Sequence, residues 1–209
     1  MNILIAVPCM DQLPAQFAQS LAMLDKGGNP VAVAFQVSSL VYTSRNELGQ
    51  KAISMGADYV MWFDSDMVFR PDTLVKLLEN MKDGRIMTGM YFKRVAPYSP
   101  VLYEKLEVED GHCVFEDLKE IPKEDLFEVK GCGFGCVLMP GDALMSVMAK
   151  YGDLFTPAWG MGEDLAFCYR ARQCGYEIIC DQTIPLGHVG NHIVTRGLYD
   201  AFRDQGGNT

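Results

Sequence analysis

Two aspartates, Asp64 and Asp66, stand directly after an apolar run at residues 59–63. Alternate residues of an extended chain project to the same side, so both carboxylates can face one point. Converging carboxylates repel each other unless a cation lies between them, and hard oxygen ligands suit Mg²⁺ or Mn²⁺. The same residues also fit an ordinary turn or helix cap, because Asp is common in turns and Pro71 fits the first turn of a following helix. The pair is therefore a candidate metal site that the rest of the chain must support.

The segments around this pair alternate between strand-like and helix-like patterns. We predict strands over residues 2–8, 31–37, 59–63 and 85–92. We predict helices between them over residues 12–26, 43–55 and 71–82. Such alternation is typical of an α/β fold with a central, mostly parallel sheet flanked by helices. The two aspartates then lie at the carboxyl end of the third strand, the edge where ligands bind in open α/β sheets.

The pattern changes in the second half of the chain. Residues 93–130 contain short strand candidates, three prolines and an acidic stretch at residues 104–125, and they predict a variable, loop-rich insertion. Residues 128–139 return to strand character, interrupted by Gly131, Gly133 and Gly135. Glycines at alternate positions indicate either the close approach of a backbone or ligand, or a β-bulge. The remaining segments are predicted as helices over residues 141–151 and 163–174, a strand over residues 176–180, and a loop with His188 and His192.

Length and composition limit the function classes. The chain has 209 residues, 49% of them hydrophobic, which is enough for one large domain with a proper core and excludes a disordered chain. We treat residues 1–203 as one domain and residues 204–209 as a flexible tail. The net charge of −9 argues against an extended nucleic-acid surface, because neutralising phosphates requires clustered Lys and Arg. One small phosphate ligand held by a metal is compatible with this charge.

Cysteine usage and hydropathy bear on the compartment. The seven cysteines are scattered, and Cys9, Cys168 and Cys180 lie in apolar segments, where Cys behaves as a small hydrophobe. This odd, scattered set predicts a reduced, cytoplasmic protein. No apolar run approaches the length needed to span a membrane, and the short apolar start at residues 1–9 lacks the basic residues of a targeting signal.

The order of the motifs resembles that of one known family. The chain carries, in order, the Asp pair, a Gly-rich strand, the run Trp-Gly-Met-Gly-Glu-Asp at residues 159–164, a helix with Arg170, and His188. This order is similar to that of the nucleotide-sugar-dependent glycosyltransferases of the GT-A fold, especially the family-2-like branch, over residues 2–190. Residues 159–164 also resemble the acceptor loop of β-1,4-galactosyltransferases. The resemblance implies a single-domain GT-A fold and a transferase (EC 2.4 class) that moves a sugar from a nucleotide-diphosphate donor, a UDP-sugar, to an acceptor hydroxyl.

The resemblance implies a metal site built from distant parts of the chain. Asp66 matches the aspartate that binds the metal most directly, and Asp64 contacts metal-bound water or the donor ribose. His188 supplies another metal ligand, and because imidazole suits Mn²⁺ better than Mg²⁺, Mn²⁺ is the expected ion. A loop histidine bonded to the backbone is the alternative for His188. In that case His192 is the substitute ligand, and His112 belongs to the insertion.

Glu163 and Asp164 are the catalytic candidates. They stand at a predicted helix start, where the helix dipole ordinarily favours acidic residues. The resemblance gives Asp164 the role of general base, which removes the proton from the acceptor hydroxyl as that oxygen attacks the anomeric carbon. The expected reaction is inverting. Trp159 offers a flat face for a sugar ring, although a core position is the commoner role of Trp.

Four residues are candidates for binding the nucleotide. Pro8 and Asp11, at the end of the first strand, match the expected base-binding position. Arg45, at the start of the second helix, matches an arginine near the nucleotide, with a solvated helix end as the alternative. Ser65 lies between the two aspartates of the motif.

Two other functions fit parts of the sequence. Residues 64–68 also match the Asp-x-Asp-x-Thr/Val signature of haloacid-dehalogenase-type phosphatases, in which Asp64 would be the nucleophile. That family usually carries the signature on its first strand, whereas two strand–helix units precede it here. A nucleotide-sugar-binding module without catalysis is the third possibility, and Asp164 argues against it. The acceptor of a transferase is left open as a glycan, a protein, a lipid or a small molecule.

Overall fold

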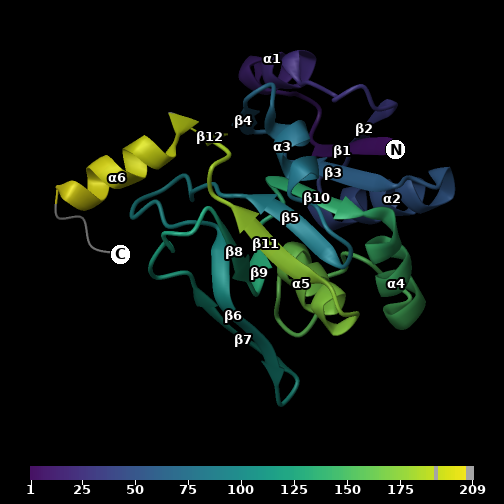
Figure 1. Ribbon diagram of the computed structural model, residues 1–209. Helices are drawn as coiled ribbons and strands as arrows, with labels where there is room; N and C mark the ends of the chain where they lie inside the picture. Colours follow the sequence, from purple (N-terminus) through teal and green to yellow (C-terminus); the bar gives the residue numbers. More distant parts are fainter. Residues whose placement is uncertain (191–192, 206–209) are drawn as a thin grey trace.

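The computed structural model describes residues 1–190 and 193–205, and its centre is a seven-stranded sheet (Figure 1). The strand order across this sheet is β2-β1-β3-β10-β5-β11-β8. Its strands are β1 (Ile3–Cys9), β2 (Val31–Val37), β3 (Tyr59–Phe63), β5 (Arg85–Gly89), β8 (Leu126–Val129), β10 (Cys136–Pro140) and β11 (Glu177–Asp181).

Five of these strands run in one direction. β1 pairs in parallel with β2 and β3, β11 pairs in parallel with β5, and β10 lies antiparallel between β3 and β5. β8 closes the other edge, antiparallel to β11. The prediction of a mixed, mostly parallel sheet is therefore confirmed. The parallel order places the carboxyl ends of β1, β2 and β3 at one edge, where the Asp pair emerges.

Helices cover both faces of the sheet and create two hydrophobic cores. The helices are α1 (Ala15–Met23), α2 (Val41–Met55), α3 (Thr73–Glu79), α4 (Gly141–Tyr151), α5 (Glu163–Gln173) and α6 (Arg196–Asp204). Alternate residues of β1 serve the two cores: Leu4 packs with α2, α4 and α5, whereas Ile5 packs with α1 and α3. The apolar strands of the sequence are buried on both faces for this reason.

Helix α2 begins slightly earlier than predicted. It starts at Val41 after Leu40, without a side-chain cap. It ends as predicted, with Gly56 in the left-handed conformation at φ 61°. The earlier start places residue 45 in the first turns of the helix, at the ligand-binding edge of the sheet.

A small second sheet carries His188. It consists of β4 (Met67–Phe69), β12 (Leu186–Val189) and β13 (Ile193–Val194), in the order β13-β12-β4. His188 is opposite Met67 in the antiparallel register of β12 and β4. The predicted loop at His188 is therefore wrong, because β12 pairs with β4, more than a hundred residues earlier, and with β13, which follows it.

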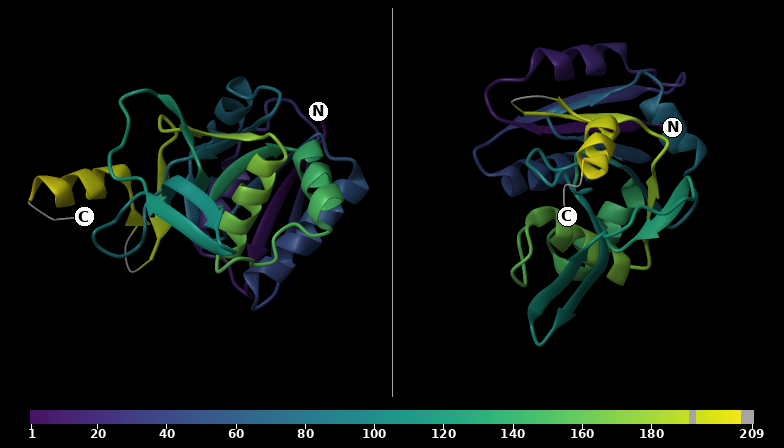
Figure 2. Two further views of the ribbon diagram at one scale, coloured as in Figure 1. Left: turned by 90° about the horizontal axis from the view of Figure 1, so that it is seen from below. Right: turned by 90° about the vertical axis from the view of Figure 1, so that its left-hand side faces the viewer.

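Residues 93–130 differ from the predicted loop-rich insertion. Strands β6 (Leu102–Glu109) and β7 (His112–Asp117) form an antiparallel hairpin, and β9 (Gly131–Cys132) pairs with β6. Asp110 and Gly111 adopt positive φ angles of 50° and 80° at the turn, as hairpin turns of this kind require. The hairpin and α6 both extend away from the main sheet (Figure 2).

Two further findings concern the cysteines and the helices. All seven cysteines are free. Among the described residues, no helix combines the length and the apolar character that a membrane span requires. Helix α6 extends to Asp204, the first residue of the predicted tail.

Candidate functional site

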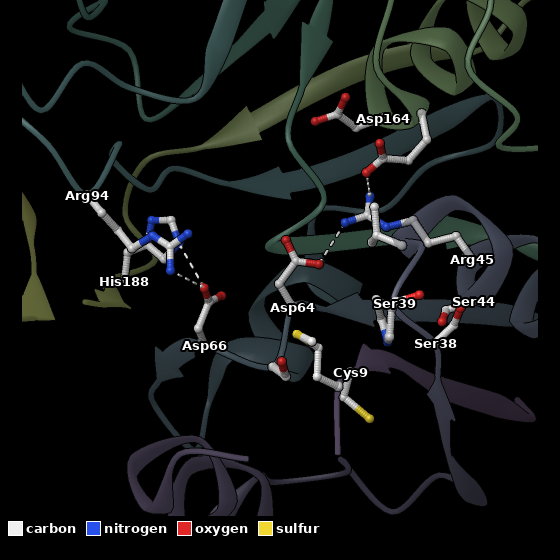
Figure 3. Close-up of a pocket in the computed structure, with 15 residues that line it drawn as sticks. Cys9, Ser38, Ser39, Ser44, Arg45, Asp64, Asp66, Arg94, Asp164 and His188 are labelled. Atoms are coloured by element: carbon white, nitrogen blue, oxygen red, sulfur yellow. Dashed lines mark hydrogen bonds and ion pairs between the residues drawn. The ribbon is translucent and has the colours of Figure 1, made fainter. Parts of the chain in front are cut away.

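A pocket opens at the edge of the sheet where β1, β2 and β3 end. Its volume is about 530 Å³. Its walls come from the ends of these strands, the starts of α2 and α5, the loop after β5, and β12. The lining residues are Pro8, Cys9, Met10, Ser38, Ser39, Val41, Ser44, Arg45, Asp64, Ser65, Asp66, Arg94, Glu163, Asp164 and His188 (Figure 3). Segments more than a hundred residues apart thus contribute to one cavity.

Arg45, Asp64, Glu163 and Asp164 form what we call the buried cluster. Nη2 of Arg45 donates a hydrogen bond of 2.7 Å to Oδ1 of Asp64, and its Nη1 lies 3.8 Å from Oε1 of Glu163. The Arg45 side chain is only 3% exposed and stacks over the ring of Phe134. Burial lowers the pKa of Arg45, but the neighbouring carboxylates outweigh this and raise it. The guanidinium therefore remains charged and holds Asp64 in place.

Burial has the opposite effect on the carboxyl groups of this cluster. It raises the pKa of Asp64, against the lowering effect of Arg45. It also raises the pKa of Asp164 to about 6, with Arg45 opposing and Glu163 reinforcing the shift. Oδ1 of Asp164 accepts a hydrogen bond of 2.7 Å from the amide of Leu165, in the first turn of α5. A carboxyl group with a pKa near neutrality is suited to accept a proton at physiological pH.

Asp66, Arg94 and His188 form the open cluster on the other side of the pocket. Oδ2 of Asp66 lies 3.1 Å from Nη1 of Arg94 and 3.4 Å from Nε2 of His188. Nδ1 of His188 lies 2.8 Å from the carbonyl oxygen of Phe92, to which it can donate. Burial raises the pKa of Asp66, but the hydrogen bond and charge of His188 and the charge of Arg94 outweigh it, so this pKa is lowered. Burial lowers the pKa of His188, and its bonds to Asp66 and Phe92 outweigh that effect and raise it.

The open cluster offers two ligands suited to a divalent cation. With Nδ1 bonded to a carbonyl, His188 directs Nε2 towards Asp66. A histidine that binds a metal through one ring nitrogen usually makes such a hydrogen bond with the other. Two ligand atoms that each lie about 2.1 Å from one ion, at right angles, are about 3 Å apart, close to the spacing seen here. Residues 1–190 and 193–205 contain no group of three or more His, Cys, Asp or Glu side chains placed to hold an ion. Asp66 and His188 thus fit an ion that keeps water or phosphate as its other ligands.

The structure brings most of the predicted site residues together. Asp64, Ser65, Asp66, Glu163, Asp164, His188, Arg45 and Pro8 all line the pocket. Oδ1 of Asp64 is bonded to Arg45. Glu163 opens helix α5 after Gly162, as predicted.

Two other predicted site residues, Asp11 and Trp159, do not line the pocket. Asp11 is exposed beyond the end of β1, outside the pocket wall. Trp159 packs against Tyr151 and Tyr169, with its backbone at a positive φ of 53°. His112 is exposed on β7, and His192 lies outside the described residues.

Some pocket residues were missed by the sequence analysis. Ser38 and Ser39 follow β2 at the edge where parallel strands end, a position that the predicted strand bounds could have indicated. Ser44 is 1% exposed, and its Oγ has no hydrogen-bond partner within the part of the chain that the structure describes. Arg94 lies in the segment predicted as an insertion, and no local pattern distinguishes it from other surface arginines.

The alternating glycines make room for a tyrosine below the site. A Cβ at Gly133 would lie 2.1 Å from Oη of Tyr91, and one at Gly135 would lie 2.8 Å from its Cζ. Tyr91 is 5% exposed, accepts a hydrogen bond from the amide of Gly135, and meets the ring of His188 edge-on at 5.3 Å. The group that approaches Gly133 and Gly135 is thus the Tyr91 side chain, and not the backbone or ligand that the sequence analysis expected.

Solved structures with this fold include proteins crystallised with nucleotide ligands. A197 from STIV superposes with a TM-score of 0.63 at 18% identity, over 91% of this chain and 86% of that one. GalNAc-T7 with UDP, GalNAc and Mn²⁺ superposes with a TM-score of 0.58 at 9% identity, over 90% of this chain and 44% of that one. TarS from S. aureus with UDP-GlcNAc superposes with a TM-score of 0.53 at 14% identity, over 86% and 56% of the two chains.

These likenesses establish the GT-A fold that the sequence predicted, and at such identities they establish the fold alone. The chain spans about half the length of GalNAc-T7 and TarS. No protein-family model matches the sequence, and no curated protein matches it.

Proposed function

We propose that this protein is a metal-dependent glycosyltransferase that transfers a sugar from a UDP-sugar to an acceptor hydroxyl with inversion. One observation carries the proposal: Asp66 and His188, the ligands for a cation, share a pocket with Asp164, a carboxyl group whose pKa is raised to about 6. The fold, which GalNAc-T7 and TarS share, and the ligands in their crystals support the choice of donor class.

The buried cluster provides the proton acceptor of the proposed reaction. Oδ1 of Asp164 is bonded to the Leu165 amide, so its second oxygen is the one to accept the proton of the acceptor hydroxyl. The hydroxyl oxygen forms a bond to the anomeric carbon while the bond from that carbon to the diphosphate oxygen breaks, and the nucleoside diphosphate leaves. Attack opposite the leaving group inverts the anomeric configuration. Arg45 fixes Asp64 and Glu163 and stays in place through the reaction.

The open cluster provides the charge that the leaving group needs. Asp66 and His188 would hold Mn²⁺, or Mg²⁺, which when bound neutralises charge on the departing diphosphate. Arg94 adds a guanidinium at the same wall of the pocket. The hydroxyl groups of Ser38, Ser39 and Ser44, beside Pro8, offer hydrogen bonds to the nucleoside at the other end of the cavity.

The phosphatase alternative is less well supported. Its nucleophile would be Asp64, but Oδ1 of Asp64 accepts a hydrogen bond of 2.7 Å from a buried arginine, which reduces its nucleophilicity. The Asp pair also follows the third strand of a GT-A sheet.

Calorimetric titration with UDP tests the proposed site. We expect UDP to bind the native protein in Mn²⁺ and to bind much more weakly in EDTA. Asp66→Ala should abolish the metal-dependent component of UDP binding, because His188 alone cannot hold the ion against water. Asp72→Ala, which removes an exposed aspartate paired with Lys76, is the matched control and should leave binding unchanged.

Two further measurements, one of binding and one of activity, complete the test. A screen of nucleotide sugars for Mn²⁺-dependent thermal stabilisation should identify the donor. Hydrolysis of p-nitrophenyl phosphate should be absent. Unchanged UDP affinity in Asp66→Ala would remove the metal assignment, and phosphatase activity that is lost in Asp64→Asn would favour the alternative. If the protein binds a UDP-sugar but transfers it to no acceptor, its function is that of a binding module without catalysis.

A further inference from the structure

The side chains of Arg94 and His188 converge on a single oxygen of Asp66. Nη1 of Arg94 lies 3.1 Å from Oδ2, and Nε2 of His188 lies 3.4 Å from the same atom (Figure 3). In the proposed function this carboxylate is a metal ligand. The guanidinium of Arg94 and a divalent cation would therefore compete for one partner.

The side chain of Arg94 is half exposed and has few polar contacts. The side chain is 53% exposed, and its only hydrogen bond among the described residues is the one to Asp66. Its stem lies over Gly190, where a Cβ would come within 3.3 Å of Cδ, so the absence of a side chain there leaves the arginine room.

The loop that carries Arg94 is anchored at both ends. The carbonyl of Phe92 contacts His188, and the ring of Phe92 stacks on Tyr199 of α6 at 4.8 Å. The amide of Lys93 donates to the carbonyl of Ser99 at 2.9 Å, which closes the loop. A change of rotamer is therefore enough to move the guanidinium, without movement of the loop.

We propose that Arg94 exchanges between two anions: it pairs with Asp66 in the free protein and with the diphosphate of the donor when a divalent cation is bound at Asp66 and His188. This inference rests on the proposed function. A cation at Asp66 both takes the partner of Arg94 and repels its charge. The diphosphate of the incoming nucleotide then offers acceptor oxygens, which the planar fork of an arginine can bind in a bidentate manner.

The exchange couples the binding of metal and nucleotide. Without nucleotide, Arg94 competes with the cation and lowers the affinity of the site for it. With nucleotide, Arg94 binds the diphosphate and raises the affinity of the whole assembly. Because binding free energies are reciprocal, each ligand should strengthen the binding of the other. The site then takes up a metal–nucleoside-diphosphate complex in preference to the free ion.

Titration with Mn²⁺, read by the electron paramagnetic resonance of the free ion, tests this exchange. Without UDP, Arg94→Ala should bind Mn²⁺ about two- to fivefold more tightly than the native protein, the range for loss of a partly exposed ion pair. With saturating UDP, the same variant should bind Mn²⁺ at least about tenfold more weakly, as expected for loss of charge-assisted hydrogen bonds. The sign of the effect thus reverses between the two titrations, which structural damage would not produce.

Two control variants separate charge from geometry. Arg94→Lys keeps the charge, so without UDP it should bind Mn²⁺ as the native protein does, whereas with UDP it should fall between the native protein and Arg94→Ala. Arg70→Ala removes another exposed arginine that is paired with an aspartate, Asp72, and should change neither titration.

The possible results distinguish this inference from the proposed function. If the native protein binds Mn²⁺ and Arg94→Ala behaves identically, or shifts both titrations in the same direction, the exchange is refuted and the metal site stands. If the native protein binds no Mn²⁺ with or without UDP, the proposed metal site is refuted, and the exchange is refuted with it.

Discussion

Asp64 pairs with Arg45 at 2.7 Å, and Asp66, two residues later in the same motif, pairs with Arg94 at 3.1 Å. The Arg45 side chain is 3% exposed and that of Arg94 53%. The pKa of Asp64 is raised by burial, whereas the pKa of Asp66 is lowered, since His188 and Arg94 outweigh its burial. The two arginine–aspartate pairs are therefore similar in length but differ in burial and in the pKa of the aspartate.

The difference follows from the elements that supply the arginines. Arg45 projects from α2 into the space between β3 and α5, where Phe134 covers it, so its charge is fixed among carboxylates. Arg94 projects from a surface loop. We infer that the buried cluster maintains the geometry and pKa values of the proton-transfer side of the pocket. The open cluster remains able to exchange its cations.

The largest expected effect lies in the buried cluster. Asp164→Asn keeps the size of the side chain and the acceptor for the Leu165 amide but removes the proton acceptor. The rate of sugar transfer should fall about 10²- to 10⁴-fold while UDP-sugar affinity stays nearly constant. Single-turnover kinetics beside calorimetry would measure both. Transfer at the native rate, or a product that keeps the anomeric configuration of the donor, would show that Asp164 is not the base of an inverting reaction.

Removal of the buried arginine should chiefly affect stability. Arg45→Met keeps much of the side-chain volume but leaves Asp64 and Glu163 without their cation. The free energy of unfolding should fall by about 3 kcal/mol, as when one partner of a buried pair is removed. Urea denaturation would measure this loss. The double variant Arg45→Met, Asp64→Asn should recover part of it, and no recovery would mean that the pair is not the cause.

The elements that carry Asp64, Asp66 and Asp164 could be predicted from the sequence. β3 and α4 were predicted with their observed bounds, because each is a continuous apolar or amphipathic segment with clear end signals. The start of α5 at Glu163 was equally clear. Local periodicity determines such elements, and the positions of Asp64, Asp66 and Asp164 follow from them.

The parts that sequence did not reveal depend on long-range pairing. β12 is a strand because β4 and β13 pair with it, and the short strand candidates of residues 93–130 did not indicate that β6 and β7 pair as a hairpin. The loop with Arg94 is positioned beside Asp66 by contacts of Phe92 with His188 and Tyr199, which are distant in the sequence. Trp159, predicted near the donor, instead packs with Tyr151 and Tyr169, and its backbone has a positive φ of 53°.

A smaller effect concerns the pH dependence of stability. The pKa of Asp164 is about 6 in the folded protein, whereas the ordinary value for an aspartate is 3.8. Between these values the unfolded chain loses its proton first, so ionisation destabilises the folded state as pH rises from about 4 to about 6. Asp164→Asn, which cannot ionise, should therefore be more stable than the native protein at pH 7.5, by up to about 3 kcal/mol. Thermal denaturation should show little difference at pH 4, and a difference that is independent of pH would contradict the assigned ionisation.

The smallest expected effect sharpens the comparison between the two arginines. Arg94→Ala removes an ion pair as short as many buried ones, but the side chain is half exposed, so water and salt screen its charge. The free energy of unfolding should change by less than about 1 kcal/mol, the range for exposed pairs. Urea denaturation of Arg94→Ala beside Arg45→Met, at low and at high salt, would measure the contrast. If Arg94→Ala lost as much stability as Arg45→Met, Arg94 would be a structural residue. Its guanidinium could not then leave Asp66 at low cost, and the distinction between a fixed and an exchangeable arginine would be lost.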